Sequence, residues 1–572
     1  MRMIAILSTA LLLIGCDLHR PLGNDLKVQP SSPLPGAGTG SANSPSSASP
    51  TLTWKGNPGA DSYQVQVDST CGAASSCAFT SPQIDTTVTT TSFAPPAPLA
   101  IPTTGTHSQT YCWRVRGCQK GVCGDWSDPR CFVVGATKSL NRDLNGDGYP
   151  DFVVGAPNDS SGQTSAGKAY VYLGGPNLPT RPALVIDDNI ANDALGYGVA
   201  MVGDVNGDGY GDYVVQTSGA TMSNGLLDRV MVFFGGRVLK AQPDITFTGP
   251  TSQDAIFLPT GCGDLNGDGY DDIAFETLHY DANTTQPPRV EIHFGGPDMA
   301  TSAPLVLASP HPTDILVFSI AAAGDVNGDG YPDLIVGSSG SQVGVSSVVG
   351  EALVYYGGSP MDATADVIFQ APDLVPALLP FPVAGVGDIN GDGFADVAIA
   401  AGDLSWASTV YVYYGGTAPH TSPDLTLQED YPGTSFGLSI LPAGDLNHDG
   451  YADFAVLSGN GGTFAGPPEK GGGNTYVLLP GKVFLYAGGQ APSDSAFATV
   501  AAEASHPYIV GGSVLDVDGD GEPEIMVSDS NENGFSPTSH SQIAIYRGSN
   551  SYQTPVRVLS GFSGGNGIVL GN

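Results

Sequence analysis

The feature that most constrains the fold is an acidic nine-residue pattern, which first reads DLNGDGYPD at residues 143–151. The pattern starts again at Asp204, Asp264, Asp325, Asp388, Asp445 and Asp516, at steps of 61, 60, 61, 63, 57 and 71 residues. Such a regular period indicates an array of equal supersecondary units that bury their apolar surfaces against one another. The sequence therefore predicts seven repeats over residues 136–572.

Every unit has the same internal order of strands and turns. The acidic loop leads into an apolar run such as residues 152–154, and a second apolar run ends in a Gly-Gly pair, as at residues 170–175. Two further stretches follow, and the second of them leads into the next acidic loop. Because four short strands per unit are typical of a propeller blade, we expect an all-β chain whose main part is a seven-bladed β-propeller.

The two ends of the repeat region predict how the ring closes. Residues 137–141, ahead of the first acidic loop, are too few and too polar to supply a strand. Residues 564–572 read GGNGIVLGN, match the strand that precedes the other acidic loops, and have no unit of their own to complete. We therefore expect this last strand to complete the first unit and cover its exposed edge.

The acidic loops predict a metal-binding role. Positions 1, 3, 5 and 9 carry side-chain oxygens, position 7 can offer its carbonyl oxygen, and position 6 is Gly in every copy. Oxygen ligands on a flexible loop suit Ca²⁺ better than Mg²⁺ or Zn²⁺. An EF-hand is excluded because position 12 is apolar, thrombospondin-like calcium repeats are excluded by the period, and a metal-free turn would leave three carboxylates repelling one another.

We therefore expect up to seven Ca²⁺ ions that act as structural staples. The expected ligands are Asp143, Asn145, Asp147, Tyr149, Asp151, Asp204, Asn206, Asp208, Tyr210, Asp212, Asp264, Asn266, Asp268, Tyr270, Asp272, Asp325, Asn327, Asp329, Tyr331, Asp333, Asp388, Asn390, Asp392, Phe394, Asp396, Asp445, Asn447, Asp449, Tyr451, Asp453, Asp516, Asp518, Asp520, Glu522 and Glu524. The seventh loop departs most from the pattern, through its two Glu residues, and the sixth has His448 where the others have Gly.

This pattern resembles the FG-GAP repeats of the integrin alpha-subunit propeller, which also occur in bacterial surface proteins. Phe436 and Gly437, ahead of the sixth acidic loop, supply the Phe-Gly half of the repeat, and residues 155–157 read GAP. The resemblance covers about three quarters of the chain. It implies a seven-bladed ring with calcium loops and, by analogy alone, a role in adhesion.

The N-terminus is predicted to be an export signal with a lipid anchor. Arg2 is followed by an apolar run at residues 4–14, which is too short to span a bilayer. The run ends in LIGC at residues 13–16, which resembles a bacterial lipobox, and an ordinary signal peptide with a chance cysteine is the alternative. The resemblance implies removal of residues 1–15, lipidation of Cys16, and a place in the bacterial cell envelope facing the periplasm or the exterior.

Residues 16–50 are predicted to be a disordered tether. Residues 30–50 consist almost wholly of Pro, Ser, Gly and Ala and carry no charge. Such a segment cannot bury enough apolar surface to order itself. The lipid anchor would then be the chain's contact with the membrane.

A small disulfide-bearing β-sandwich is expected over residues 51–135. Alternating apolar and polar runs at residues 63–67 and 111–116 predict strands with one buried face, and the segment resembles a fibronectin type III domain apart from its cysteines. An even cysteine cluster in an exported protein indicates disulfides rather than zinc, because CxxC pairs are missing. The expected disulfide cysteines are Cys71, Cys77, Cys112, Cys118, Cys123 and Cys131. Their spacing favours the pairs Cys71–Cys77 and Cys118–Cys123. This leaves Cys112 to pair with Cys131.

Composition and motifs narrow the function. The chain has 56 acidic against 20 basic residues and a net charge of −36, which argues against nucleic acid as a partner. Residues 433–437 read GTSFG and fit a nucleophile pattern, but they fall where the repeat places its Phe-Gly strand, and no HExxH occurs. We therefore expect no catalytic residue.

The expected function is an envelope-anchored calcium-binding protein that mediates adhesion or ligand binding. Its partner would be a protein or a glycan, contacted by variable loops on one propeller face. Residues 459–480 and 528–542 are candidate contact loops, and tolerated surface insertions are the equal alternative. The alternative functions are a hydrolase or lyase acting on an envelope or extracellular polymer, and a passive structural lipoprotein.

Overall fold

The computed structural model describes part of the chain, and every element in that part is a strand. The described residues are 30–32, 52–54, 59–69, 79–93, 95, 108–127, 130–135, 140–219, 226–249, 251, 254–279, 289–308, 316–339, 350–370, 382–402, 408–429, 435–459, 463–465, 476–478, 480–502, 505–530, 541–548, 552, 554–562 and 569–570. The predicted lipidation site Cys16 and the cysteines Cys71 and Cys77 lie outside them. Within them, no helix is long and apolar enough to cross a membrane.

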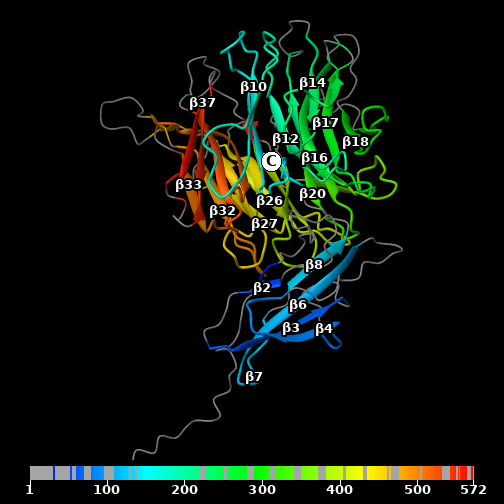
Figure 1. The fold of residues 1–572 in the computed structure, drawn as a ribbon, viewed down its shortest axis with the longest axis vertical. Helices are drawn as coiled ribbons and strands as arrows, with labels where there is room; N and C mark the ends of the chain where they lie inside the picture. Colours follow the sequence, from blue (N-terminus) through cyan, green and yellow to red (C-terminus); the bar gives the residue numbers. More distant parts are fainter. Residues whose placement is uncertain are drawn as a thin grey trace, which may run out of the picture.

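Seven four-stranded antiparallel sheets make up most of the described chain (Figure 1). The first holds β9 (Phe152–Ala156), β10 (Lys168–Tyr172), β11 (Leu184–Ile186) and β38 (Val569–Leu570). The second holds β12 (Gly198–Gly203), β13 (Asp212–Gln216), β14 (Arg229–Phe233) and β15 (Ile245–Thr248). The third holds β16 (Asp254–Gly263), β17 (Asp272–His279), β18 (Arg289–His293) and β19 (Leu305–Ala308).

The remaining four sheets repeat the same order along the chain. The fourth holds β20 (Leu316–Gly324), β21 (Asp333–Ser339), β22 (Gly350–Tyr355) and β23 (Val367–Gln370). The fifth holds β24 (Val383–Gly387), β25 (Asp396–Gly402), β26 (Ser408–Tyr413) and β27 (Leu425–Gln428). The sixth holds β28 (Phe436–Gly444), β29 (Asp453–Ser458), β32 (Lys482–Tyr486) and β33 (Ala498–Ala501), and the seventh β34 (Tyr508–Leu515), β35 (Glu524–Ser530), β36 (Ser541–Tyr546) and β37 (Arg557–Phe562).

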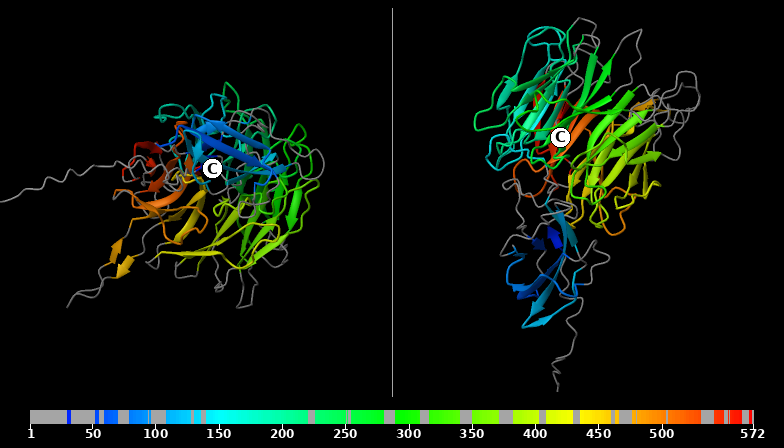
Figure 2. Two further views of the ribbon diagram at one scale, coloured as in Figure 1. Left: turned by 90° about the horizontal axis from the view of Figure 1, so that it is seen from below. Right: turned by 90° about the vertical axis from the view of Figure 1, so that its right-hand side faces the viewer.

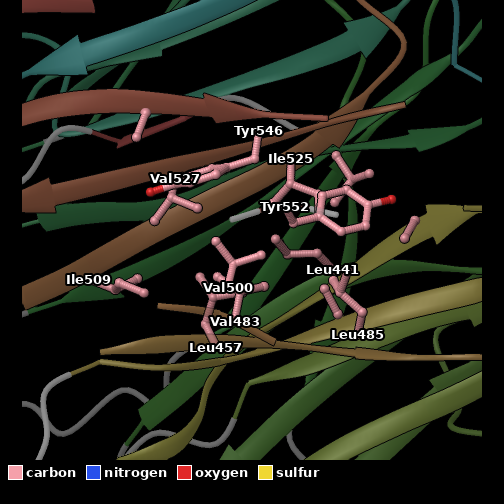
Figure 3. Close-up of a cluster of buried hydrophobic side chains, with 14 of the residues drawn as sticks. Leu441, Leu457, Val483, Leu485, Val500, Ile509, Ile525, Val527, Tyr546 and Tyr552 are labelled. Carbon is pink, nitrogen blue, oxygen red and sulfur yellow. The ribbon is translucent and has the colours of Figure 1, made fainter. Parts of the chain in front are cut away.

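Hydrophobic clusters join each sheet to the next. Figure 3 shows one of them, in which Leu457 and Leu485 of the sixth sheet pack against Ile525 and Val527 of the seventh. Equivalent clusters lie between every other consecutive pair. A further cluster joins the seventh sheet to the first, where Phe152 packs with buried side chains of β35 and β36. The sheets therefore pack in a cyclic, propeller-type order, as the repeat period predicts.

The last strand of the chain completes the first sheet. β38 pairs antiparallel with β9, and Val569 lies opposite Gly155 and Leu570 opposite Val154. β38 also contacts β34 of the seventh sheet and β12 of the second, so it takes the inner-edge place that β12, β16, β20, β24, β28 and β34 take elsewhere. The prediction that the C-terminal strand completes the first unit is confirmed.

Two further antiparallel sheets are formed by the N-terminal strands, drawn in blue beneath the ring in Figure 1 and in the right-hand view of Figure 2. One holds β1 (Pro30–Ser32), β2 (Leu52–Trp54) and β5 (Ser92–Phe93). The other holds β3 (Ser62–Asp68), β4 (Ile84–Val88), β6 (Ser108–Gln119), β7 (Val122–Cys123) and β8 (Arg130–Gly135). Trp54 of the first sheet packs against Tyr63 and Trp113 of the second, which fills the space between them.

Two details of this N-terminal region bear on the expectations. Cys118 and Cys123 form a disulfide, the pairing that their spacing favoured, and Cys112 is also disulfide-bonded. Cys131 lies directly opposite Cys112 in the register of β6 and β8. Residues 30–32, inside the predicted tether, pair their backbone with β2, and the rest of the tether lies outside the described residues. A polar, Pro-containing segment can add to a sheet edge through main-chain hydrogen bonds without burying side chains.

The two candidate contact loops each include residues that form strands. Residues 459–480 include a short hairpin of β30 (Thr463–Ala465) and β31 (Tyr476–Leu478). Of residues 528–542, the first three belong to β35 and the last two to β36, and the segment between them lies outside the described residues. Sequence reasoning placed these insertions correctly but overestimated the second, because polar strand ends resemble loop sequence.

Candidate metal centre: a ring of acidic loops

Each acidic loop folds around the carboxylate at its first position. In the first loop, Asp143 Oδ1 accepts the N–H of Asp147 at 3.1 Å, and Oδ2 accepts the N–H of Gly148 at 2.7 Å. The same two bonds occur in the other six loops. Gly148 has φ of 92°, a left-handed conformation that explains why position 6 is Gly. The position-1 carboxylate is thereby held against the backbone N–H groups of positions 5 and 6.

The carboxylate at position 9 fastens each loop to its own sheet. In the fourth loop, Asp333 Oδ2 accepts the N–H of Val326 and Oδ1 accepts the N–H of Gly357, both at 2.8 Å. Gly357 is the first residue of the Gly-Gly pair. The corresponding Gly bond is made by Asp151, Asp212, Asp272, Asp396 and Asp453. Sequence reasoning gave position 9 to the metal alone, and the recurring Gly-Gly pair is the signal that indicates this second role.

Burial makes these position-9 carboxylates costly to ionise. Asp151, Asp212 and Asp272 are fully buried, and burial, with repulsion from the acids at positions 1 and 5, raises the pKa of each to about 8. Burial also raises the pKa of Asp333 and Asp396 well above its usual range. Within the described part of the chain, no Lys, Arg or His forms an ion pair with the position-9 Asp of the first six loops. A bound divalent cation would offset this repulsion, so the oxygen donors of these six loops fit Ca²⁺.

Neighbouring loops contact one another through an aromatic ring and a glycine. The ring of Tyr210, at position 7 of the second loop, covers Gly146, at position 4 of the first, so closely that a Cβ on that glycine would lie 2.6 Å from Tyr210 Cε1. The same contact recurs around the ring in the pairs Gly207 and Tyr270, Gly267 and Tyr331, Gly328 and Phe394, Gly391 and Tyr451, and Gly519 and Tyr149. The last pair joins the seventh loop to the first. Position 7 is therefore aromatic for packing against the preceding loop.

One junction lacks this contact, and both of its partners differ from the pattern. Position 4 of the sixth loop is His448, and position 7 of the seventh is Glu522. Since no aromatic ring follows in the seventh loop, a side chain is tolerated at position 4 of the sixth, where His448 is exposed. Comparison of adjacent repeats in the sequence could have linked these two departures.

A backbone hydrogen bond adds to the coupling between loops. The second residue of each Gly-Gly pair donates its N–H to the carbonyl at position 2 of the preceding loop, as Gly236 does to Leu144 at 2.7 Å. Gly175 donates in the same way to Val517 of the seventh loop at 2.9 Å. This bond holds every acidic loop except the sixth to the next repeat, because the seventh repeat has no Gly-Gly pair.

The seventh loop holds a cationic side chain of the protein. Arg547, which follows β36, donates from Nε to Glu524 Oε1 at 2.6 Å and forms an ion pair with Asp518. Glu524 Oε2 accepts the N–H of Val517 at 2.9 Å, the bond that position 9 makes in most other loops. Burial raises the pKa of Glu524 to about 7.

The serine of the nucleophile pattern has a structural place in the repeat. Ser435 has φ of 54° and accepts the N–H of Leu438 in the turn before the Phe-Gly strand. Ala194, at the same place in an earlier repeat, has φ of 51° and accepts the N–H of Tyr197. The backbone conformation of Ser435 therefore belongs to the repeat. Cys262 is buried in β16, which raises the pKa of its thiol.

Comparisons with known proteins identify the repeats. The FG-GAP repeat model matches residues 139–172 and 317–349, and an FG-GAP-like repeat model matches residues 388–456. Integrin alpha-4 of Xenopus laevis is 37% identical over 145 residues, 23% of this chain and 13% of that protein. Integrin alpha-6 of Gallus gallus is 31% identical over 175 residues, 28% of this chain and 15% of that protein.

Two further matches complete the comparison. Phosphatidylinositol-glycan-specific phospholipase D of Rattus norvegicus is 30% identical over 154 residues, 24% of this chain and 18% of that protein. A solved mutant of AofleA from Arthrobotrys oligospora aligns with a TM-score of 0.33 and 11% identity over 67% of this chain and 94% of that chain. The chain spans 13–18% of the length of these curated relatives. It contains FG-GAP repeats that are similar to those of integrin alpha subunits.

Proposed function

We propose that the repeat region is a seven-bladed β-propeller stapled by Ca²⁺, which acts in adhesion or ligand binding for a protein or glycan partner. The observation that carries the proposal is the ring of acidic loops with buried position-9 carboxylates that have no cationic partner among the described residues in the first six loops. The similarity to integrin alpha subunits supports a binding role.

Ca²⁺ would be held by side-chain oxygens at positions 1, 3, 5 and 9 and by the carbonyl at position 7. Its chemical contribution is charge neutralisation and fixed geometry, which hold each loop in the shape that contacts its neighbours. Exported calcium modules bind with Kd of about 10⁻⁴–10⁻³ M, so sites of this kind remain filled outside the cell. We infer a structural role for the ions.

The partner surface is proposed on the face opposite the acidic loops. The acidic loops join the first strand of each sheet to the second, as between β12 and β13. In an antiparallel sheet the next connection, such as residues 157–167 between β9 and β10, leaves from the other end. These second connections vary in length and sequence and include the hairpin of β30 and β31, visible at the lower left of the left-hand view of Figure 2. Loops on a rigid scaffold commonly carry recognition.

The enzymatic alternative rests on one relative, whose name is that of a phospholipase D. The match covers 18% of that protein, and Ser435 precedes the strand β28 instead of opening a helix, as the nucleophile of a G-x-S-x-G turn does. We therefore favour a binding protein without catalytic residues. We also propose that the N-terminal sheets form a fibronectin type III-like spacer and that a lipidated Cys16 anchors the protein in a bacterial cell envelope.

The test is binding of residues 30–572, which include β1, to arrays of glycans and extracellular proteins, in calcium and in chelator. The account predicts a ligand bound in calcium and lost in chelator. A matched variant, Asp388→Asn, changes one loop carboxylate on the opposite face and should weaken binding only through reduced stability. Absence of binding in both conditions, with the protein folded by circular dichroism, would contradict the proposed function.

A further inference from the structure

The seventh acidic loop departs from the other six at three places that meet in space. Position 3 is Asp518 where the others have Asn, and position 9 is Glu524 where the others have Asp. Arg547 stands between the end of β36 and Gly548, a place occupied in the other repeats by uncharged residues. Those residues are Leu173, Phe234, Phe294, Tyr356, Tyr414 and Ala487.

The three changed side chains bond to one another. Arg547 Nε donates to Glu524 Oε1 at 2.6 Å, and its Nη2 forms an ion pair with Asp518 Oδ2. The side chains of Asp518 and Glu524 are 7% and 0% exposed. One oxygen each of Asp516, Asp518 and Glu524 lie within 4.8 Å of one another. Carboxylates gathered this closely require a positive charge, and the guanidinium supplies it.

In the loops without this arginine, the side chains at positions 3 and 9 make different hydrogen bonds. In the first loop, the amide of Asn145 donates to Asp147 Oδ2 at 2.9 Å, a bond that Asp518 cannot make because an ionised carboxylate has no donor. Oδ1 of each other position-9 residue accepts a Gly N–H, whereas Glu524 Oε1 accepts the guanidinium. The added carboxylate at position 3 and the longer carboxylate at position 9 therefore match the added arginine.

We propose that the guanidinium of Arg547 takes the place of the metal ion in the seventh loop, so that the ring takes up at most six Ca²⁺ ions. The inference rests on the proposed calcium binding of the other loops. The guanidinium lies against Oδ2 of position 3 and Oε1 of position 9, so its positive charge would repel a cation held by the oxygens of the seventh loop. Arginine keeps its charge at every relevant pH, so the guanidinium supplies this positive charge at all times.

This arrangement lies where the ring closes. Val517, at position 2 of the seventh loop, donates its N–H to Glu524 and accepts the N–H of Gly175 from the first repeat. With a built-in cation, this connection between the last and first repeats persists at calcium concentrations that empty the other loops. The ring therefore stays closed when calcium is scarce.

The test counts the calcium ions bound to the full chain, purified in detergent, by native mass spectrometry at saturating calcium. Asp516→Asn alters position 1 of the seventh loop and should leave the count unchanged. Asp388→Asn, the matched control, alters position 1 of the fifth loop and should lower the count by one ion. Loss of one ion through Asp516→Asn would overturn the proposal. No ions on the unaltered chain would instead overturn the proposed calcium function.

A second variant tests the arginine directly. The triple change D518N/E524D/R547L gives the seventh loop the residues that the first repeat has at these three places. The expected result is one ion more than on the unaltered chain, and Asp516→Asn in this background should remove it. An unchanged count in a triple variant shown to be folded by circular dichroism would contradict the view that Arg547 excludes the metal.

Discussion

Replacement of Gly146 by Ala tests whether the acidic loops are coupled around the ring. Gly146 has φ of 76°, and a Cβ there would lie 2.6 Å from Tyr210 Cε1 of the next loop. The left-handed conformation costs a non-glycine residue about 1–2 kcal/mol. Displacing a packed ring adds about 1–3 kcal/mol. We therefore expect Gly146→Ala to lower the free energy of unfolding by about 2–5 kcal/mol.

A double-mutant cycle with Tyr210→Ala separates the two contributions. Once the ring is removed, Gly146→Ala should cost only the backbone strain, so the coupling free energy should be about 1–3 kcal/mol. The assay is urea unfolding of the four proteins in saturating calcium. His448→Ala is the matched control at position 4 of the sixth loop, where no aromatic ring follows, and should change stability by less than about 0.5 kcal/mol. A coupling free energy near zero would refute the inter-loop contact.

Three further predictions concern pH, closure and the N-terminal sheets. In calcium-free protein the position-9 carboxyls of the first three loops have a pKa of about 8 in the folded state, above their value in the unfolded state. The folded state therefore gains stability from holding these protons. This gain is complete below about pH 4 and is lost as the pH rises toward 8. The melting temperature in EDTA should therefore fall as the pH rises from about 5 to about 8, while the increase caused by calcium grows, and a constant difference between calcium and EDTA would contradict this. Deletion of residues 564–572 removes β38 and should lower the melting temperature of all the repeat sheets together, and unchanged melting would contradict closure by that strand. Cys118→Ser removes the disulfide to Cys123, which closes a loop of sequence separation 5, and should lower the free energy of unfolding of the N-terminal sheets by about 2 kcal/mol. The number of bound calcium ions should not change, and a changed number would refute the independence of these sheets from the repeat sheets.

The repeat period and the unpaired ends predicted most of the fold. A fixed spacing of acidic loops predicts equal sheets, and the absence of a strand before Asp143 predicts closure by the C-terminal strand, which β38 confirms. These inferences succeed because each unit is local in sequence and the closing strand has no other place to pair.

The missed features are contacts that reach beyond a single acidic loop. The bond from Gly357 to Asp333, the ring of Tyr210 on Gly146 and the ion pairs of Arg547 each join residues that a reading within one nine-residue loop treats separately. Positions 7 and 9 looked like metal ligands alone, because the partner of position 7 lies in the preceding loop and that of position 9 follows another strand of the same sheet. The coincident departures in the seventh repeat were visible in the sequence, but only geometry shows that they meet.

The central claim, that calcium ions staple the acidic loops, is tested most directly by thermal unfolding of the full chain in calcium and in EDTA. The account predicts that calcium at about 1 mM raises the melting temperature of the repeat sheets and leaves that of the N-terminal sheets unchanged. The increase should be reduced by Asp388→Asn and retained by Asp516→Asn. Melting curves that are the same in calcium and in EDTA would contradict the account.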